Sequence, residues 1–247
     1  MRVAALFDIH GNVPALDAVL EEVRRAGVDR IVVGGDVLPG PMPHEALTRL
    51  LNLDMPVDFI FGNCEVAVLD EIAHRVPKGP ERFRPTLQWT VQQIGPAYGQ
   101  LIASWPKTLS LIVDGLGEVL FCHATPRNED ECFTRLTPED RVTPVLDGVT
   151  AAVVVCGHTH MQFDRMVGGT RVVNAGSVGM PFGKPGADWL LLGPEVKLQH
   201  TAYDLADAAS RIRETAFPWP DGDFAARYVL DPPSEAEMLD VFSRASI

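Results

Sequence analysis

Short apolar runs that end in polar, glycine-containing loops recur in the first quarter of the chain. Val3 to Phe7, Arg30 to Val33 and Val57 to Phe61 are such runs, and each precedes a stretch with helical spacing of apolar residues. The first helix is predicted to begin at an Asn12 cap and to end at Gly27. Repetition of strand, polar loop and helix predicts a parallel sheet, with ligand-binding loops at the carboxyl ends of its strands.

From Leu109 onward the pattern changes to β-hairpins. Apolar strands flank Asp114–Gly115 and Gly168–Gly169, and a third hairpin is expected around the segment DWLLL. These hairpins predict a second sheet, mixed or antiparallel. The two halves together predict an α/β fold, a four-layer α/β/β/α sandwich in which two mixed sheets are flanked by helices.

The stretch between Glu65 and Trp105 has a helical pattern that the segment PKGPERFRP interrupts. We expect a single domain over residues 1–247, in which a small helical cap could form around residues 75–105. The end of the chain is predicted to carry a short helix capped by Ser234.

Composition narrows the classes of partner and compartment. A net charge of -12 disfavours binding to nucleic acid or to an anionic membrane, because both attract Lys and Arg. The sequence shows no signal peptide and no uninterrupted apolar stretch of about 18 residues. Four cysteines without a CxxC pair indicate a reducing setting, so we predict a cytoplasmic location. The oligomeric state stays open.

Residues of metal-binding types follow the predicted strands. Each is weak evidence alone, because an Asp after a strand is more often a turn residue or a helix cap. The two-residue spacing in Asp8/His10 and in His158/His160 places both members of a pair on one side of an extended segment. Mixed carboxylate, imidazole and amide ligands suit Mn, Fe, Zn or Ni. The set as a whole therefore predicts a metal site, and it comprises Asp8, His10, Asp36, Asn63, His123, His158 and His160.

The order of these motifs, DxH, GD, GN, H and GHxH, resembles the calcineurin-like metallophosphoesterase superfamily. The segments DIHGN, GNCE and NAGSVG resemble its small bacterial and archaeal phosphodiesterase branch. The resemblance implies two divalent metal ions, Mn first, with Fe, Zn, Ni or Mg as alternatives. It implies that one ion is held by Asp8, His10 and His160 and the other by Asn63, His123 and His158, with Asp36 bridging them.

The resemblance also implies an activity. We expect a metal-dependent phosphodiesterase or phosphatase in which a hydroxide that bridges the two metal ions cleaves a small phosphorylated substrate, with nucleotides among the candidates. Asp36, Asn63 and His123 would then be catalytic. Two other functions stay open: a dinucleoside polyphosphate hydrolase, and a non-catalytic metal-binding scaffold of the same fold.

Three residues near the motifs have two interpretations each. Cys64 stands where many superfamily members have a His, and it is either a weak acid or a small buried residue. Asn12 is expected both to cap its helix and to bind substrate or orient the site. Arg127 either binds the substrate phosphate or forms a solvated ion pair with acidic neighbours.

Overall fold

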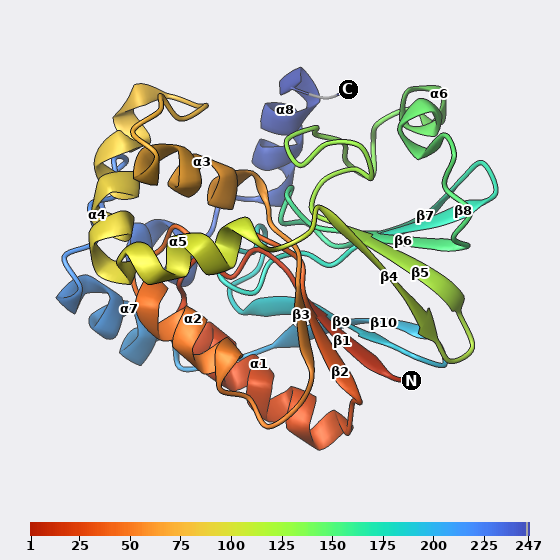
Figure 1. The fold of residues 1–247 in the computed structure, drawn as a ribbon, viewed down its shortest axis with the longest axis horizontal. Coiled ribbons are helices and arrows are strands. Elements are labelled where there is room, and N and C mark those ends of the chain that lie inside the picture. Colours follow the sequence, from red (N-terminus) through yellow and green to blue (C-terminus); the bar gives the residue numbers. More distant parts are fainter. Residues whose placement is uncertain (246) are drawn as a thin grey trace.

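The computed structural model, which describes residues 1–245 and 247, contains two five-stranded sheets packed against each other (Figure 1). In the first sheet, β1, β2 and β3 are parallel, and β9 and β10 are added antiparallel beside β1. The order across this sheet is β10 (Val196–Thr201), β9 (Ala187–Leu192), β1 (Val3–Leu6), β2 (Arg30–Val33) and β3 (Val57–Phe59).

The second sheet is also mixed. Its β5 and β6 are parallel, as are β6 and β8, while β4 and β7 pair antiparallel at the two edges. The order across this sheet is β4 (Thr108–Val113), β5 (Gly117–Cys122), β6 (Val153–Cys156), β8 (Thr170–Asn174) and β7 (Phe163–Val167).

Helices lie outside both sheets (Figure 1). Among the described residues, no helix has both the length and the apolar character needed to cross a membrane. In chain order the helices are α1 (Val13–Ala26), α2 (Pro43–Leu51), α3 (Asn63–Ile72), η1 (Glu81–Phe83), α4 (Arg84–Ile94), α5 (Pro96–Ala103), α6 (Glu139–Val142), η2 (Thr143–Leu146), α7 (Leu205–Glu214), η3 (Ala226–Leu230) and α8 (Glu235–Ala245).

The alternation of side chains along each strand builds the layers. In β1, Val3 and Ala5 pack between the two sheets, whereas Ala4 and Leu6 pack against the helices on the outer face. A third apolar cluster, which includes Phe133, covers the outer face of the second sheet beneath the short α6 and η2. The predicted fold class, two mixed sheets flanked by helices, is confirmed.

One detail of the predicted topology is wrong. The third hairpin, β9–β10, does not join the second sheet but extends the first sheet beside β1. Every residue of β9 is buried, so this strand fits the centre of a sheet that is covered on both faces. The pattern of apolar residues in a hairpin does not determine which sheet its strands pair with. The expectation that this hairpin would belong to the second sheet failed for this reason.

The predicted caps of two helices are confirmed. Asn12 Oδ1 accepts a hydrogen bond from Ala15 N at 3.2 Å, and Gly27 ends α1 in the left-handed conformation. Ser234 Oγ accepts from Glu237 N at 3.2 Å before α8.

Candidate metal centre

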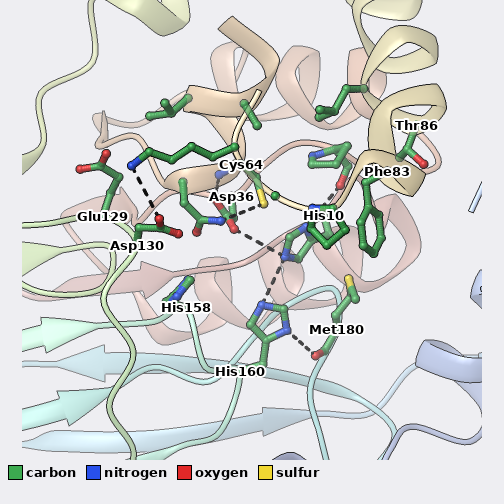
Figure 2. Close-up of a pocket in the computed structure, with 18 of the residues that line it drawn as sticks. His10, Asp36, Cys64, Phe83, Thr86, Glu129, Asp130, His158, His160 and Met180 are labelled. Carbon is green, nitrogen blue, oxygen red and sulfur yellow. Dashed lines mark hydrogen bonds and ion pairs between the residues drawn. The ribbon is translucent and has the colours of Figure 1, made fainter. Parts of the chain in front are cut away.

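The predicted ligand residues gather where the carboxyl ends of parallel strands from both sheets meet. In Figure 2, His10, Asp36 and His160 point toward one another, and dashed lines join them. The first sheet supplies Asp8 and His10 after β1, Asp36 after β2 and Asn63 after β3; the second supplies His123 after β5 and His158 and His160 after β6.

Most of these residues have an unusual backbone conformation. A non-glycine residue in the left-handed region costs roughly 1–2 kcal/mol, and such residues concentrate at functional sites. The backbone of the loops after β1, β2 and β6 is therefore strained, and this conformation directs the candidate ligand side chains toward the centre of the cluster. The positive φ angles are 53° for Asp8, 44° for His10, 52° for Asp36, 66° for His158 and 56° for His160.

Glycines beside the ligands allow the loops to approach one another. A Cβ on Gly62 would lie 2.1 Å from Asp36 Oδ1, and a Cβ on Gly157 would lie 2.4 Å from Asp8 Oδ2. Any larger residue would displace these carboxylates. The glycines of the GN and GH motifs thus make room for the ligands of neighbouring strands.

The first group of candidate ligands is Asp8, His10 and His160. His160 Nε2 lies 3.2 Å from Asp8 Oδ1 and 3.3 Å from His10 Nε2. Asp8 Oδ2 accepts a hydrogen bond from His158 N, but the buried Oδ1 has no hydrogen-bond partner among the described residues. An unpaired buried carboxylate oxygen is unfavourable, so a cation held among these three residues would stabilise it.

Asp36 links the first group to a second one. Its Oδ2 lies 3.9 Å from His10 Nε2 and 3.5 Å from His123 Nε2. Asn63 Oδ1 lies 3.0 Å from His123 Nε2, and His158 joins Asp36 and His123 in a set of potential ligands. The structure therefore brings all the predicted ligands together, with Asp36 between the two groups.

Hydrogen bonds fix the orientation of three imidazoles. Because a carbonyl only accepts, each Nδ1 must carry the proton, and Nε2 of the neutral ring presents a lone pair to the centre. Lone pairs and carboxylate oxygens at about 3.3 Å repel one another unless a cation or a proton lies between them. The carbonyl partners are Pro39 O for His10 (3.3 Å), Gly34 O for His123 (2.9 Å) and Met180 O for His160 (2.9 Å).

The fourth imidazole, His158, has a different partner. Its Nε2 lies 3.2 Å from the thiol sulfur of Cys132, so Nδ1 is the nitrogen left for the centre. Burial and the neighbouring His123 lower the pKa of His158 to about 4, which keeps this imidazole neutral. Cys132 carried no signal in the sequence, because its contact with His158 depends on the path of a long loop.

The carboxylates charge the centre negatively. Burial alone would lower the pKa of His123, but Asp36 and Asp8 raise it to about 10. Burial alone would raise the pKa of Asp36, but His123 and His10 lower it below its usual range. The cluster thus takes up a proton when no other cation is bound, as expected of a site that fits divalent metal ions.

A model of the calcineurin-like phosphoesterase superfamily domain matches residues 1–193, which include all these candidate ligands. The chain belongs to this superfamily. A crystal structure of a metallophosphoesterase from Sphaerobacter thermophilus has 26% sequence identity and a TM-score of 0.65, and the match covers 88% of this chain and 95% of that one.

Two archaeal proteins are also similar to the chain described here. A hypothetical protein from Pyrococcus horikoshii has the same fold, with a TM-score of 0.75 at 23% identity over 88% of this chain and 94% of that chain. An uncharacterised protein of Methanocaldococcus jannaschii is 24% identical over 240 residues, or 87% of this chain and 93% of its own. Both matches therefore span most of this chain and most of the similar protein.

Glu65 holds the superfamily loops in place, a role that sequence reasoning missed. Its Oε2 accepts hydrogen bonds from Asp36 N at 2.7 Å and Gly62 N at 2.8 Å, and its Oε1 accepts from Leu38 N at 3.1 Å. Burial and the neighbouring Asp36 raise the pKa of this carboxyl to about 7. Glu65 could have been recognised in the sequence from its position three residues after Gly62, which is the capping-box position at the start of α3.

The NAGSVG segment has a similar structural role. Ser177 Oγ donates to Asp8 O at 2.7 Å, and Asn174 Nδ2 donates to Gly157 O at 2.6 Å. Both contacts hold loops that carry ligands. The sequence marked this segment only through the family resemblance, without a function for either side chain.

Asn12 and Arg127, the predicted substrate-binding residues, have protein partners. Besides capping α1, the buried Asn12 donates to Gly179 O at 3.0 Å and to Tyr203 Oη at 3.2 Å. Arg127 Nε and Nη2 bind the Glu131 carboxylate at 2.8–3.0 Å, with the arginine side chain half exposed. Neither residue lines the cleft described below, and their substrate roles stay predictions.

A cleft of about 430 Å³ opens onto the centre and continues along an apolar wall. We call the part lined by the ligand residues His10, Asp36, Asn63, His158 and His160 the polar section. The part lined by Val66, Phe83, Leu87, Met180 and Trp219 is the apolar section. Lys78 is the only Lys or Arg among the described residues that line the cleft, and its Nζ lies 3.8 Å from Asp130.

Proposed function

We propose that this chain is a dinuclear metal-dependent phosphoesterase that hydrolyses a small phosphate ester. The position of Asp36 carries the proposal, because one carboxylate lies within 4 Å of ligand nitrogens from both groups, His10 and His123. A carboxylate placed in this way can be shared by two cations. Asp8, His10 and His160 would hold one of them, and Asn63, His123 and His158 the other.

Several features of the site fit bound cations. Asp8 Oδ1 has no hydrogen-bond partner among the described residues, and Nε2 of His160 and Nε2 of His10 lie 3.2 and 4.0 Å from it. The donor set of carboxylate, imidazole and amide oxygen suits Mn, with Fe, Zn, Ni or Mg as alternatives. When bound, two divalent ions supply Lewis acidity to the phosphoryl group and activate water.

The protein contributes position and charge. Asp8 and Asp36 fix the negative charge that retains cations, and Glu65 holds the loop of Asp36. Because Lys78 is the only Lys or Arg among the described lining residues, the attraction of an anionic phosphate to the cleft would depend mainly on the cations. No protein nucleophile is required in this scheme.

Cys64 lines the cleft beside the metal ligands, where many superfamily members have a His. Burial and the carboxylate of Asp36 raise the pKa of its thiol, and Cys64 N donates to Asp36 Oδ1 at 2.9 Å. A thiol of raised pKa is a poor acid for a leaving group. The proposed enzyme should therefore favour esters with good leaving groups.

Metal removal and restoration test the proposal. The purified protein is stripped with a chelator, and hydrolysis of bis(p-nitrophenyl) phosphate and of p-nitrophenyl phosphate is followed with and without added Mn. We expect turnover that disappears on stripping and returns with the metal. Stoichiometric metal binding without hydrolysis of either ester, under any of the candidate metals, would instead identify a non-catalytic metal-binding scaffold.

A further inference from the structure

A short segment between β8 and β9 contacts His160 in three ways. His160 Nδ1 donates to Met180 O at 2.9 Å, as Figure 2 shows, and the backbone O of His160 accepts from Phe182 N at 3.4 Å. The ring of Phe182 lies nearly parallel to the imidazole, with centroids 5.1 Å apart and an angle of 17° between the planes. The segment therefore contacts both the backbone and the side chain of this candidate ligand.

The stacked ring restrains the imidazole in a way that the hydrogen bond alone does not. The bond to Met180 O fixes one ring nitrogen, whereas a flat ring against one face also limits the tilt of the imidazole plane. A histidine nitrogen binds a metal through a lone pair in that plane, so the tilt decides where Nε2 points. His160 and Phe182 are each 7% exposed, so water does not separate the two rings.

Phe182 is in turn contacted by α8. The ring of Phe242, in α8, lies beside the ring of Phe182 with centroids 6.3 Å apart. Just before the helix, Pro233 O accepts a hydrogen bond from Gly183 N at 2.8 Å. Since α8 lies beyond residues 1–193, this support comes from outside the part of the chain that matches the superfamily domain.

Both ends of α8 are attached to a second loop near the metal centre. Glu235, at the start of the helix, pairs with Arg135 at 2.6 Å, and Ile247 N, after its end, donates to Cys132 O at 3.0 Å. This is the loop whose Cys132 thiol contacts His158. The helix that carries Phe242 is thus fixed relative to the site by contacts of its own.

We propose that Phe182 and Phe242 are positioning residues for His160. Phe242 holds the Phe182 ring against the imidazole, and that ring keeps Nε2 directed at the first metal ion. The inference rests on the proposed function, because it concerns the ion assigned to Asp8, His10 and His160. Neither phenylalanine is among the described residues that line the cleft, so both act through His160 and not through contact with substrate.

Binding of Co²⁺ to the metal-free protein tests this assignment without a substrate. Cobalt takes imidazole and carboxylate ligands, and its visible absorption reports its coordination geometry. Loss of a residue that orients a metal ligand commonly weakens metal binding by roughly 10–100-fold. We therefore expect Phe182→Ala to weaken cobalt binding by about 10-fold and Phe242→Ala by about 3-fold, each with a changed absorption spectrum.

Two histidine variants show whether the effect passes through His160. In His158→Ala, which lacks a ligand assigned to the other ion, adding Phe182→Ala should again weaken binding by about 10-fold. In His160→Ala the same change should cost less than about 2-fold, because the imidazole to be positioned is gone. Losses of equal size in both backgrounds would make Phe182 a general packing residue and overturn the inference.

Val241→Ala is the matched control, because Val241 lies in α8 next to Phe242 and is 48% exposed. It should keep the cobalt affinity and spectrum of the wild type. Melting temperatures confirm that each metal-free variant is folded, and Phe182→Leu replaces Phe182→Ala if the latter is not. Wild-type affinity and spectrum in both the Phe182 variant and Phe242→Ala would also overturn the inference.

Hydrolysis of bis(p-nitrophenyl) phosphate separates the two proposals. If the Mn-loaded wild type hydrolyses this ester but the Phe182 variant binds cobalt as the wild type does, the phosphoesterase proposal stands and the positioning role is wrong. If the wild type hydrolyses no ester with any candidate metal, while the cobalt measurements give the expected pattern, the positioning role stands and the phosphoesterase proposal is wrong.

Discussion

The polar and apolar sections of the cleft are built in different ways. The polar section consists of residues in the loops that follow strands, such as His10 and Asp36, whose backbone is strained into the left-handed region. The apolar section consists of side chains from helix ends and connecting segments, such as Phe83 and Trp219, without comparable local strain. The shape of the polar section therefore depends on its backbone conformation, and the shape of the apolar section depends on the packing of aromatic side chains.

This difference separates two tasks of the proposed enzyme. Strand ends of a rigid double sheet suit the precise positions that metal ligands need, because small displacements change the coordination. Connecting segments can change their side chains without disturbing those positions. Substitutions in the polar section should therefore affect the rate of hydrolysis, and substitutions in the apolar section should affect substrate affinity.

Asp36→Asn tests the polar section most severely. The variant keeps the size of the side chain but removes the charge between the two ligand groups, so we expect kcat to fall at least about 10³-fold, or roughly 4 kcal/mol. Rates with bis(p-nitrophenyl) phosphate and metal content by atomic absorption measure the effect. The control is Asp58→Asn. Asp58 lies in β3 and forms an ion pair with Arg30 of β2, and this variant should keep the rate of the wild type. Full activity in Asp36→Asn would contradict the two-metal proposal.

Glu65→Ala tests whether the backbone of the polar section needs its buried acceptor. The change leaves three buried N–H groups, those of Asp36, Leu38 and Gly62, without this carboxylate. We expect the free energy of unfolding to drop by about 3 kcal/mol in urea denaturation. The exposed Glu21, paired with Arg25, provides the control Glu21→Ala, which should lose less than about 0.5 kcal/mol. Equal losses in the two variants would show that the loops do not depend on Glu65.

Proton release tests the charge of the polar section. With a pKa of about 10, His123 is protonated near neutral pH in the metal-free protein. Metal ions bind only the unprotonated imidazole, so metal binding should release about one proton from His123, and the affinity should weaken as the pH falls. Calorimetry in buffers of different ionisation enthalpy counts the protons. His123→Ala should lose this release and the control His44→Ala should keep it.

The same shift affects the stability of the metal-free protein. Because the pKa of His123 is raised on folding, its stabilising effect is complete below about pH 6.5 and is lost as the pH rises through about 10. Metal-free wild type should therefore lose stability over this range relative to His123→Ala. Thermal melts at several pH values would show this difference, and parallel pH profiles would refute it.

Cys64→Ala should have the smallest effect. With its raised pKa the thiol stays protonated and is a weak acid, so we expect the rate with p-nitrophenyl esters to change by less than about 3-fold. The comparison of Cys64→Ala with wild type on a poor leaving group, such as an alkyl ester, completes the test. A loss above about 10-fold on the alkyl ester alone would make Cys64 a proton donor.

The sequence predicted the polar section and not the apolar one, for a physical reason. Strand ends in a parallel sheet converge, so residues such as Asp8 and Asn63 could be placed together from local pattern alone. Phe83 and Trp219 meet only because α4 and the segment after α7 pack against each other, and no local pattern encodes that contact. Two mixed sheets were predictable, but the placement of β9 beside β1 depended on tertiary packing.

Convergence of the ligands from two sheets has a mechanical consequence. Asp8 and His10 follow a strand of the first sheet, and His160 follows a strand of the second. An ion held by all three would therefore cross-link the two sheets. Sliding or parting of the layers would have to break coordination bonds as well as apolar contacts. Metal loading should therefore stiffen the junction between the sheets, and the metal-free protein should separate there first under an applied force.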